Sequence, residues 1–212
     1  FPALVPLAFV REVERPRRPK GPSLRELSSP FKRFIVAATL FGLSEVTYML
    51  FLLYVAREVG GPAGLSPVAL AAALYVLFNV VYAAFSYPAG ALSDRLGKKW
   101  VVAAGYATFS ASCLAFATGW AKALPAAVAA FAAYGLSKAL YDGTQRAYAS
   151  DLAPAEARGY ALGVFHASVG FANLAAGAVA GLLWDLAGAA WAFAYASALS
   201  AAATALLVAA CD

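Results

Sequence analysis

Long segments without a charged side chain dominate this sequence. Residues 59–93, 100–121 and 186–211 contain no Asp, Glu, Lys or Arg, and the whole chain is 63% hydrophobic and only 13% charged. A soluble protein needs polar and charged faces on its outer helices. About twenty consecutive apolar residues instead form a helix that crosses the roughly 30 Å of hydrocarbon in a bilayer. We therefore predict an all-α integral membrane protein that is embedded in a lipid bilayer.

Six apolar segments are long enough to span the membrane with some tilt. The predicted spans are residues 34–56, 68–92, 100–118, 124–150, 160–184 and 191–210. Short connections make consecutive spans antiparallel neighbours, and together they define a transmembrane domain over residues 31–212. Residues 1–10 read as the end of a preceding transmembrane helix and residues 11–30 as a basic cytoplasmic linker, which indicates a piece of a longer protein.

Lys and Arg residues lie mainly on one side of this topology. Of the 16 in the chain, only Arg57 and Lys122 fall on the opposite side, and Lys138 falls inside a span. Basic residues near span ends are retained in the cytoplasm. The basic loops are therefore predicted to be cytoplasmic, in a multi-pass protein of the cell membrane (plasma or inner). This distribution explains the net charge of +5 without a nucleic-acid partner.

One sequence pattern occurs twice. Gly90-Ala-Leu-Ser-Asp94-Arg-Leu-Gly97 ends the second span, and Gly181-Leu-Leu-Trp-Asp-Leu-Ala-Gly188 ends the fifth. Each copy ends the second span of a group of three, and an odd number of spans per group places the two copies on opposite sides of the membrane. The basic residues of the first copy are absent from the second, as that placement requires. The pattern predicts a six-helix bundle built of two inverted three-helix repeats.

Two segments resemble those of a known family. The run Gly90-Ala-Leu-Ser-Asp-Arg-Leu-Gly-Lys-Lys99 resembles the cytoplasmic Gly-x-Leu-x-Asp-Arg-x-Gly-Arg/Lys-Arg/Lys motif of the major facilitator superfamily. The run Asp151-Leu-Ala-Pro-Ala-Glu-Ala-Arg-Gly159 is similar to the connection between the family's tenth and eleventh helices. The resemblance covers nearly the whole chain. It implies the C-terminal six-helix half of a twelve-helix transporter, namely helices seven to twelve preceded by the end of helix six and the central cytoplasmic linker, with an N-terminal six-helix half as partner.

The resemblance also implies a cytoplasmic charge network that latches one conformation and opens during the transport cycle. A topological anchor without a gating role is the alternative. The motif and gate residues are Gly90, Asp94, Arg95, Gly97, Lys98, Lys99, Asp151 and Arg158.

Ionisable residues inside the predicted spans require an explanation, because a charge at the bilayer centre costs about 2.5 to 3.5 kcal/mol on insertion scales. Glu45, Asp142 and His166 are the candidates for proton coupling. Glu45 has no basic residue of its own helix within reach, so we expect it either to be protonated or to meet Lys138 across a cavity. Lys138 and Asp142 are four residues apart and are expected to neutralise one another, with Arg146 extending the ladder. That ladder serves either structure or substrate binding.

Polar and aromatic residues recur at spacings of three and four in the second and fourth spans, so that they share helical faces. In the resembled family, the helices that correspond to the first, second, fourth and fifth spans line the cavity. The candidate cavity residues are Tyr48, Tyr75, Asn79, Tyr82, Tyr134, Lys138, Tyr141, Gln145 and Asn173. Gly163, Gly170 and Gly177 predict close helix packing beside this polar face.

These features predict a secondary active transporter that works by alternating access. An aromatic-rich apolar cavity favours proton-coupled export, by antiport, of a small amphiphilic molecule or drug. A proton-linked symporter for a sugar or organic anion is an alternative, because Lys138 suits a carboxylate. A channel or a non-transporting membrane receptor is the alternative from another class.

An enzyme is not predicted. Asp142 lacks the Gly-x-Gly-Asp partner of an intramembrane aspartyl protease, and Ser137 and His166 lack a nucleophile motif and an orienting carboxylate. The sequence contains no Gly-rich phosphate loop, and Cys113 and Cys211 form no metal-ligand spacing. We expect the chain to need no cofactor and no metal.

Overall fold

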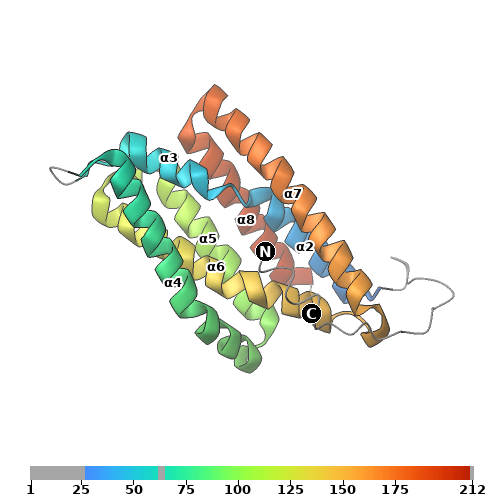
Figure 1. Ribbon diagram of the computed structural model, residues 1–212. Helices are drawn as coiled ribbons and strands as arrows, with labels where there is room; N and C mark the ends of the chain where they lie inside the picture. The colour runs from blue at the N-terminus through green and yellow to red at the C-terminus, as the bar shows by residue number, and fades with distance from the viewer. Residues whose placement is uncertain (1–26, 62–64, 211–212) are drawn as a thin grey trace, which may run out of the picture.

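A computed structural model describes residues 27–61 and 65–210, and these residues fold into a bundle of long helices (Figure 1). The predicted end of a preceding helix at residues 1–10, and most of the predicted linker at residues 11–30, lie outside the described residues. The α-helices are α2 (Ser29–Ser44), α3 (Tyr48–Glu58), α4 (Pro67–Leu96), α5 (Lys98–Ala117), α6 (Leu124–Asp151), α7 (Arg158–Ala187) and α8 (Ala189–Ala210). Short 3₁₀ turns at Trp120–Lys122 and Ala155–Ala157 lie before α6 and α7.

Six candidate membrane spans are present among the described residues, in the order that the sequence predicts. Helices α2 and α3 together form the first, Ser29–Glu58, and α4 to α8 form the others. The prediction of an all-α protein with six spans is confirmed. Helices α4 and α7 extend several residues beyond their predicted apolar spans, because charged and polar residues continue an α-helix into the interface without penalty.

The first span, which the sequence predicts as one segment over residues 34–56, consists of two helices, α2 and α3. The backbone leaves the helix at Glu45 and re-enters it at Tyr48. The Leu43 carbonyl oxygen instead accepts a hydrogen bond from the Tyr195 hydroxyl of α8, at 2.9 Å. The Thr47 side chain caps α3 by accepting from the Met49 backbone N–H. Backbone groups released inside a membrane need such partners, because no water compensates them there.

The repeat of the sequence has a structural counterpart. Helix α4 ends at Leu96 and α7 ends at Ala187, and a single glycine then separates each from the next helix. These glycines, Gly97 and Gly188, have φ of 93° and 94°, a conformation that other residues adopt only with strain. The packing repeats as well, since α4 packs on α6 as α7 packs on α2, and α5 packs against α8. The two groups of three helices are thus built alike.

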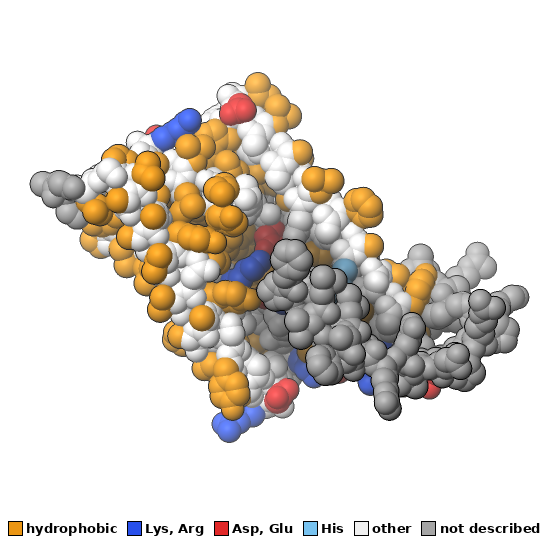
Figure 2. Space-filling view, viewed as in Figure 1, with side chains coloured by type: hydrophobic (Ala, Val, Ile, Leu, Met, Phe, Trp, Pro, Cys, Tyr) orange, Lys and Arg blue, Asp and Glu red, His pale blue; other side chains and the backbone are white. Residues whose placement is uncertain are grey.

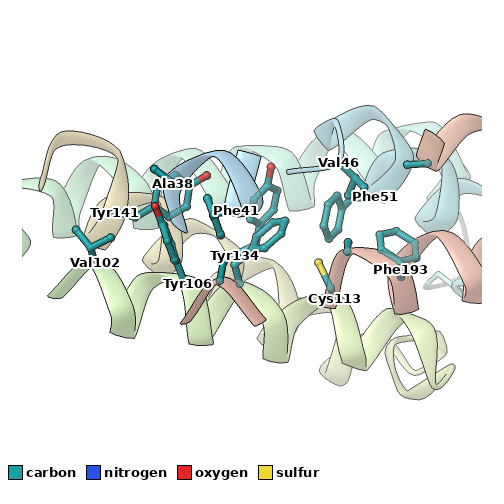
Figure 3. Packing of buried hydrophobic residues seen from close by; sticks show 14 of the residues in the cluster. Ala38, Phe41, Val46, Phe51, Val102, Tyr106, Cys113, Tyr134, Tyr141 and Phe193 are labelled. Carbon is teal, nitrogen blue, oxygen red and sulfur yellow. The ribbon is translucent and has the colours of Figure 1, made fainter. Parts of the chain in front are cut away.

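An aromatic core lies between α2, α3, α5 and α6 (Figure 3). Phe41 stacks on Tyr106 with ring centroids 3.7 Å apart, and Phe51 stacks on Tyr134 at 4.6 Å. Many hydrophobic side chains on α4 and α7 are exposed, and charged side chains gather at the two ends of the molecule (Figure 2). Phe41 and Phe51 of this core lie on either side of the break in the first span, and Val46 lies within the break.

Within residues 27–61 and 65–210, the glycines of α7 do not mediate the close helix packing that their spacing predicts. A Cβ atom added at Gly163, Gly170 or Gly177 would meet nothing within 4 Å. The close approach occurs at Gly42 of α2, where a Cβ would lie 2.9 Å from the Ala172 Cβ of α7. Spacing along one helix places residues on a face, but it does not reveal which face meets a neighbour.

Candidate functional site

The carboxylate of Glu45 is the centre of a polar cluster at the break between α2 and α3. Its Oε1 accepts hydrogen bonds from Lys138 Nζ at 2.6 Å and from the Tyr141 hydroxyl at 2.7 Å. Its Oε2 accepts from Asn173 Nδ2 at 3.2 Å. The Glu45 side chain is only 13% exposed. Three donors, one of them an ammonium, provide the environment of an ionised carboxylate. Of the two states expected for Glu45, the ion pair with Lys138 is the one observed.

Gly42 allows α7 to reach this cluster. It lies one turn before Glu45 in α2, and a Cβ at this position would stand 3.0 Å from Asn173 Oδ1 in addition to its clash with Ala172. Without a side chain at residue 42, α7 comes close enough for Asn173 to bond to Glu45. The sequence shows Gly42 only as one glycine among many.

Lys138 does not form the expected ion pair with Asp142. Asp142 Oδ2 instead accepts from Arg146 at 2.7 Å and from the Tyr82 hydroxyl at 2.8 Å. The Arg146 guanidinium also donates to the Asp142 carbonyl oxygen, and this double contact with a residue one turn away favours Arg146 as the partner. The long Lys138 side chain is free to cross to Glu45. The predicted ladder is therefore divided into two pairs.

A hollow of about 420 Å³ opens on one side of the Glu45–Lys138 pair. The Tyr48 ring of α3 stacks on the Tyr75 ring of α4, with centroids 5.1 Å apart. We call this space the tyrosine hollow. The predicted cavity residues that line it are Tyr48, Tyr75, Asn79, Tyr82, Tyr134, Lys138 and Asn173.

A second, more polar hollow of about 220 Å³ lies on the other side of the pair. We call it the histidine hollow, because His166 of α7 lines it. The other predicted site residues that line it are Glu45, Lys138, Asp142, Gln145 and Asn173. Glu45, Lys138 and Asn173 thus border both hollows, which makes them the boundary between the two spaces.

Two predicted cavity residues are buried, although Gln145 also lines the histidine hollow. Tyr141 is fully buried, packs edge-on against Phe41 and reaches Glu45 only through its hydroxyl. Gln145 is buried and accepts a hydrogen bond from Tyr106 at 2.9 Å. Sequence reasoning missed Tyr106 and Tyr195. Their hydroxyl groups in apolar spans were the available signal, but a tyrosine is too common in such spans to be singled out.

The predicted motif and gate residues lie at one end of the bundle. Lys98 at the start of α5 forms an ion pair with Asp151 at the end of α6. Lys99 is nearly buried, and its ammonium lies 5.1 Å from the centre of the Trp100 ring. A hollow of about 280 Å³ next to this end is lined in part by Gly90, Asp94 and Lys98.

The other members of the expected charge network are not joined to it within this part of the chain. Asp94, Arg95 and Arg158 form no ion pair with any residue of 27–61 or 65–210. The Lys98–Asp151 pair is therefore the observed link between the motif and the connection that follows α6.

Comparison with known proteins agrees with this architecture. The sequence model of the family described as Major Facilitator Superfamily matches residues 34–211. A protein of Methanocaldococcus jannaschii described as an uncharacterized MFS-type transporter is 35% identical over 189 residues, which cover 88% of this chain and 47% of the relative. The chain thus spans about half the length of the curated relative that it matches.

Proposed function

The chain belongs to the major facilitator superfamily, whose members are transporters and not enzymes, and from this premise we propose that it is the C-terminal six-helix half of a secondary active transporter. In this proposal α2 to α8 are helices seven to twelve, residues 1–10 end helix six, and residues 11–30 form the central linker. Alternating access then requires an N-terminal half that closes over the two hollows. The match to about half of the relative supports this division.

Glu45 is the proposed proton-coupling carboxyl, and the ion pair between Glu45 and Lys138 is the observation that carries the proposal. An ion pair within a membrane is costly unless its charges are matched. Protonation of Glu45 removes one of the two charges and leaves the Lys138 ammonium without its counter-ion. A proton at Glu45 therefore changes the charge presented to both hollows.

The sign of the coupling follows from the charge of the substrate. A cationic group that binds at Glu45 competes with the proton, and competition for one site is the requirement for antiport. An anionic group that binds at Lys138 is favoured when Glu45 is protonated, and this cooperation gives symport. Both statements express the reciprocity of linked binding.

Antiport of a small amphiphilic molecule is our first candidate. The tyrosine hollow presents aromatic rings for an apolar body and the Glu45 carboxylate for a polar or cationic group. Export is the direction that such antiport gives where protons flow inward. His166 and Asp142, in the histidine hollow, supply a polar route for the proton between Glu45 and the cytoplasmic end.

Symport of a sugar or organic anion is the second candidate, and the exposure of Lys138 favours it. The Lys138 side chain is 27% exposed, compared with 13% for Glu45. The ammonium has three N–H donors, of which Glu45 Oε1 accepts one. A carboxylate in the tyrosine hollow can therefore reach Lys138 before Glu45 has been released.

Transport by the full-length protein in liposomes tests these proposals. Under antiport, an acidic lumen drives uptake of ethidium, an amphiphilic aromatic cation; under symport, an acidic exterior drives uptake of labelled gluconate. The Glu45→Gln protein is expected to lose the response to the gradient, whereas Asp185→Asn, at the far end of α7, keeps it. Proton-driven accumulation by Glu45→Gln at the normal level would contradict the proposal. A channel is distinguished by its failure to show counterflow of labelled substrate.

The cytoplasmic end has a proposed gating role. We assign to Lys98 and Asp151 a latch that holds α5 against the end of α6 in one conformation. Asp94, Arg95 and Arg158 lie at the same end and have no ion-pair partner among the described residues, so they are available to an N-terminal half. The basic loops at this end face the cytoplasm in the proposed orientation.

A further inference from the structure

We propose that Asn173 reports the protonation of Glu45 by turning its side-chain amide, so that α7 responds directly to the proton. This inference rests on the proposed role of Glu45 in proton coupling. It makes Asn173 a positioning residue and not only a wall of the two hollows.

The two ends of the Asn173 amide are in unequal surroundings. Nδ2 donates to Glu45 Oε2 at 3.2 Å. Oδ1 is buried and has no hydrogen-bond partner among the described residues. A buried amide oxygen without a donor is uncommon in proteins and calls for a specific reason. In this orientation the amide donates a hydrogen bond to the ionised carboxylate, and its own oxygen is left without a donor among the described residues.

Protonation of Glu45 changes the hydrogen bond that its Oε2 can make with Asn173. Oε1 already accepts from Lys138 and Tyr141 at short distance, whereas Oε2 has the single longer contact to Asn173. The proton therefore adds to Oε2, which then becomes a donor. The Asn173 N–H cannot accept that hydrogen bond, but the amide oxygen can.

A half-turn of the Asn173 amide about its last side-chain bond supplies this acceptor, and the side chain occupies the same space as before. It places Oδ1 opposite Oε2 and moves Nδ2 to the buried position beside Gly42. The Val169 carbonyl oxygen borders the same space, 3.3 Å from where a Gly42 Cβ would stand. The N–H gains a potential acceptor at a position where the oxygen has no donor. Both protonation states of Glu45 are then hydrogen-bonded, each with its own amide orientation.

Asn173 is the residue whose side chain bonds to Glu45 Oε2, whereas the other described polar groups around Glu45 have other partners or make no bond to that oxygen. From α6, Lys138 and Tyr141 act as donors to Oε1, and the charges of Asp142 and Arg146 are used in their own pair. The remaining titratable groups of neighbouring elements are the hydroxyls of Tyr48, Tyr75, Tyr82, Tyr134 and Tyr195 and the imidazole of His166. The Tyr82 hydroxyl donates to Asp142, and the Tyr195 hydroxyl donates to the Leu43 carbonyl oxygen. None of these groups makes a hydrogen bond to Oε2.

Infrared difference spectroscopy of the full-length protein, acidic minus neutral, tests the inference. This chain contains the asparagines Asn79 and Asn173. Labelling of the full-length protein with ¹³C-asparagine marks the asparagine amide bands, and a band is assigned to one of these residues by its loss when that residue is substituted. We expect a protonated carboxyl band that is lost in Glu45→Gln. We also expect an asparagine C=O band that moves to lower frequency on acidification, because the amide oxygen gains a hydrogen bond, and that is lost in Asn173→Leu.

A matched control and an isosteric variant complete the experiment. Asn79→Leu removes an amide that bonds to the Tyr75 carbonyl, and its spectrum should keep both bands. Asn173→Asp, which keeps the shape of the side chain, removes the same amide band if Asn173→Leu fails to fold. In Asn173→Leu the Glu45 carboxyl band should move to higher frequency, because its O–H has lost its acceptor.

The outcomes separate the two proposals. A Glu45 carboxyl band with an unchanged Asn173 band overturns the amide turn and leaves proton coupling by Glu45 intact. Absence of any Glu45 carboxyl band overturns both, because Asn173 then has no protonation to report. The inference is supported if the Asn173 C=O band shifts over the same pH range in which the Glu45 carboxyl band appears, and if this shift is absent in both Glu45→Gln and Asn173→Leu.

Discussion

Lys138 Nζ lies 2.6 Å from Glu45 Oε1, at the break between α2 and α3, and pairs with it instead of with Asp142 on its own helix. The pair connects α6 to the point where the first span leaves its helical path. A membrane-embedded pair of this kind is destabilised strongly when one partner is removed, because the other charge remains buried. The two charges should therefore depend on each other in both stability and transport.

Removal of one member of the Glu45–Lys138 pair should lower the free energy of unfolding more than removal of both. We expect Lys138→Met to lower the free energy of unfolding by about 3–5 kcal/mol and the double change Glu45→Gln/Lys138→Met to recover most of that loss. The buried Cys113 thiol permits measurement by its reaction with a fluorogenic maleimide during heating, in a background in which every other cysteine, Cys211 included, is replaced by Ser. Additive losses in the double variant would show that the pair is not coupled.

Gly42→Ala should separate α2 from α7. The added Cβ would overlap Ala172 and press on Asn173, and overpacking of this kind costs about 1–3 kcal/mol. Gly163→Ala is the matched control, because its Cβ would meet no described residue within 4 Å and a helical Ala is favoured over Gly. The unfolding temperature and the rate of proton-driven transport should both fall in Gly42→Ala and not in Gly163→Ala. Equal behaviour of the two variants would refute the contact.

Gly97→Ala and Gly188→Ala should destabilise the protein by similar amounts. Both glycines have φ near 94° and an extended ψ, and a non-glycine residue held in such a sparsely populated backbone region costs about 1–3 kcal/mol. Gly181→Ala, inside α7 and facing open space, should be neutral or stabilising. Unfolding of the three variants is compared by the Cys113 assay. A loss at only one of the two junctions would contradict their structural equivalence.

Exchange of charges between Lys98 and Asp151 distinguishes a latch from an anchor. Asp151→Lys alone should reduce the transport rate, and Lys98→Asp/Asp151→Lys should restore most of it, because the ion pair is reformed in reverse. The Asp151 side chain is 52% exposed, so the effect on unfolding should stay within about 1 kcal/mol. Normal transport by Asp151→Lys, measured in liposomes, would favour a topological anchor.

Tyr195→Phe should loosen the break between α2 and α3. The change leaves the Leu43 carbonyl oxygen without its donor, and an unsatisfied buried group costs about 1–3 kcal/mol. Amide hydrogen exchange should accelerate in residues 45–50 while α5 stays protected. Tyr87→Phe is the control, because the Tyr87 side chain is 85% exposed and its loss of a hydroxyl should change neither measurement.

Much of the fold followed from local properties of the sequence. The charge-free segments required membrane spans, because hydrophobicity and length act within one segment. The repeated Gly-x-Leu-x-Asp-x-x-Gly pattern predicted equivalent helix ends, and Gly97 and Gly188 have the same positive φ, which only a glycine adopts without strain. The polar residues of the site were also recognisable, since ionisable groups in apolar spans stand out individually.

The pairing of those residues was decided only by the tertiary structure. Sequence spacing placed Lys138 beside Asp142, but packing of α2 against α6 and α7 brought Glu45 within reach of both Lys138 and Asn173. The break at Glu45 and the close approach at Gly42 likewise depend on partners from α8 and α7. A side chain bonds to whichever group the neighbouring helices bring nearest, and that distance is a property of the packed bundle, not of any single segment.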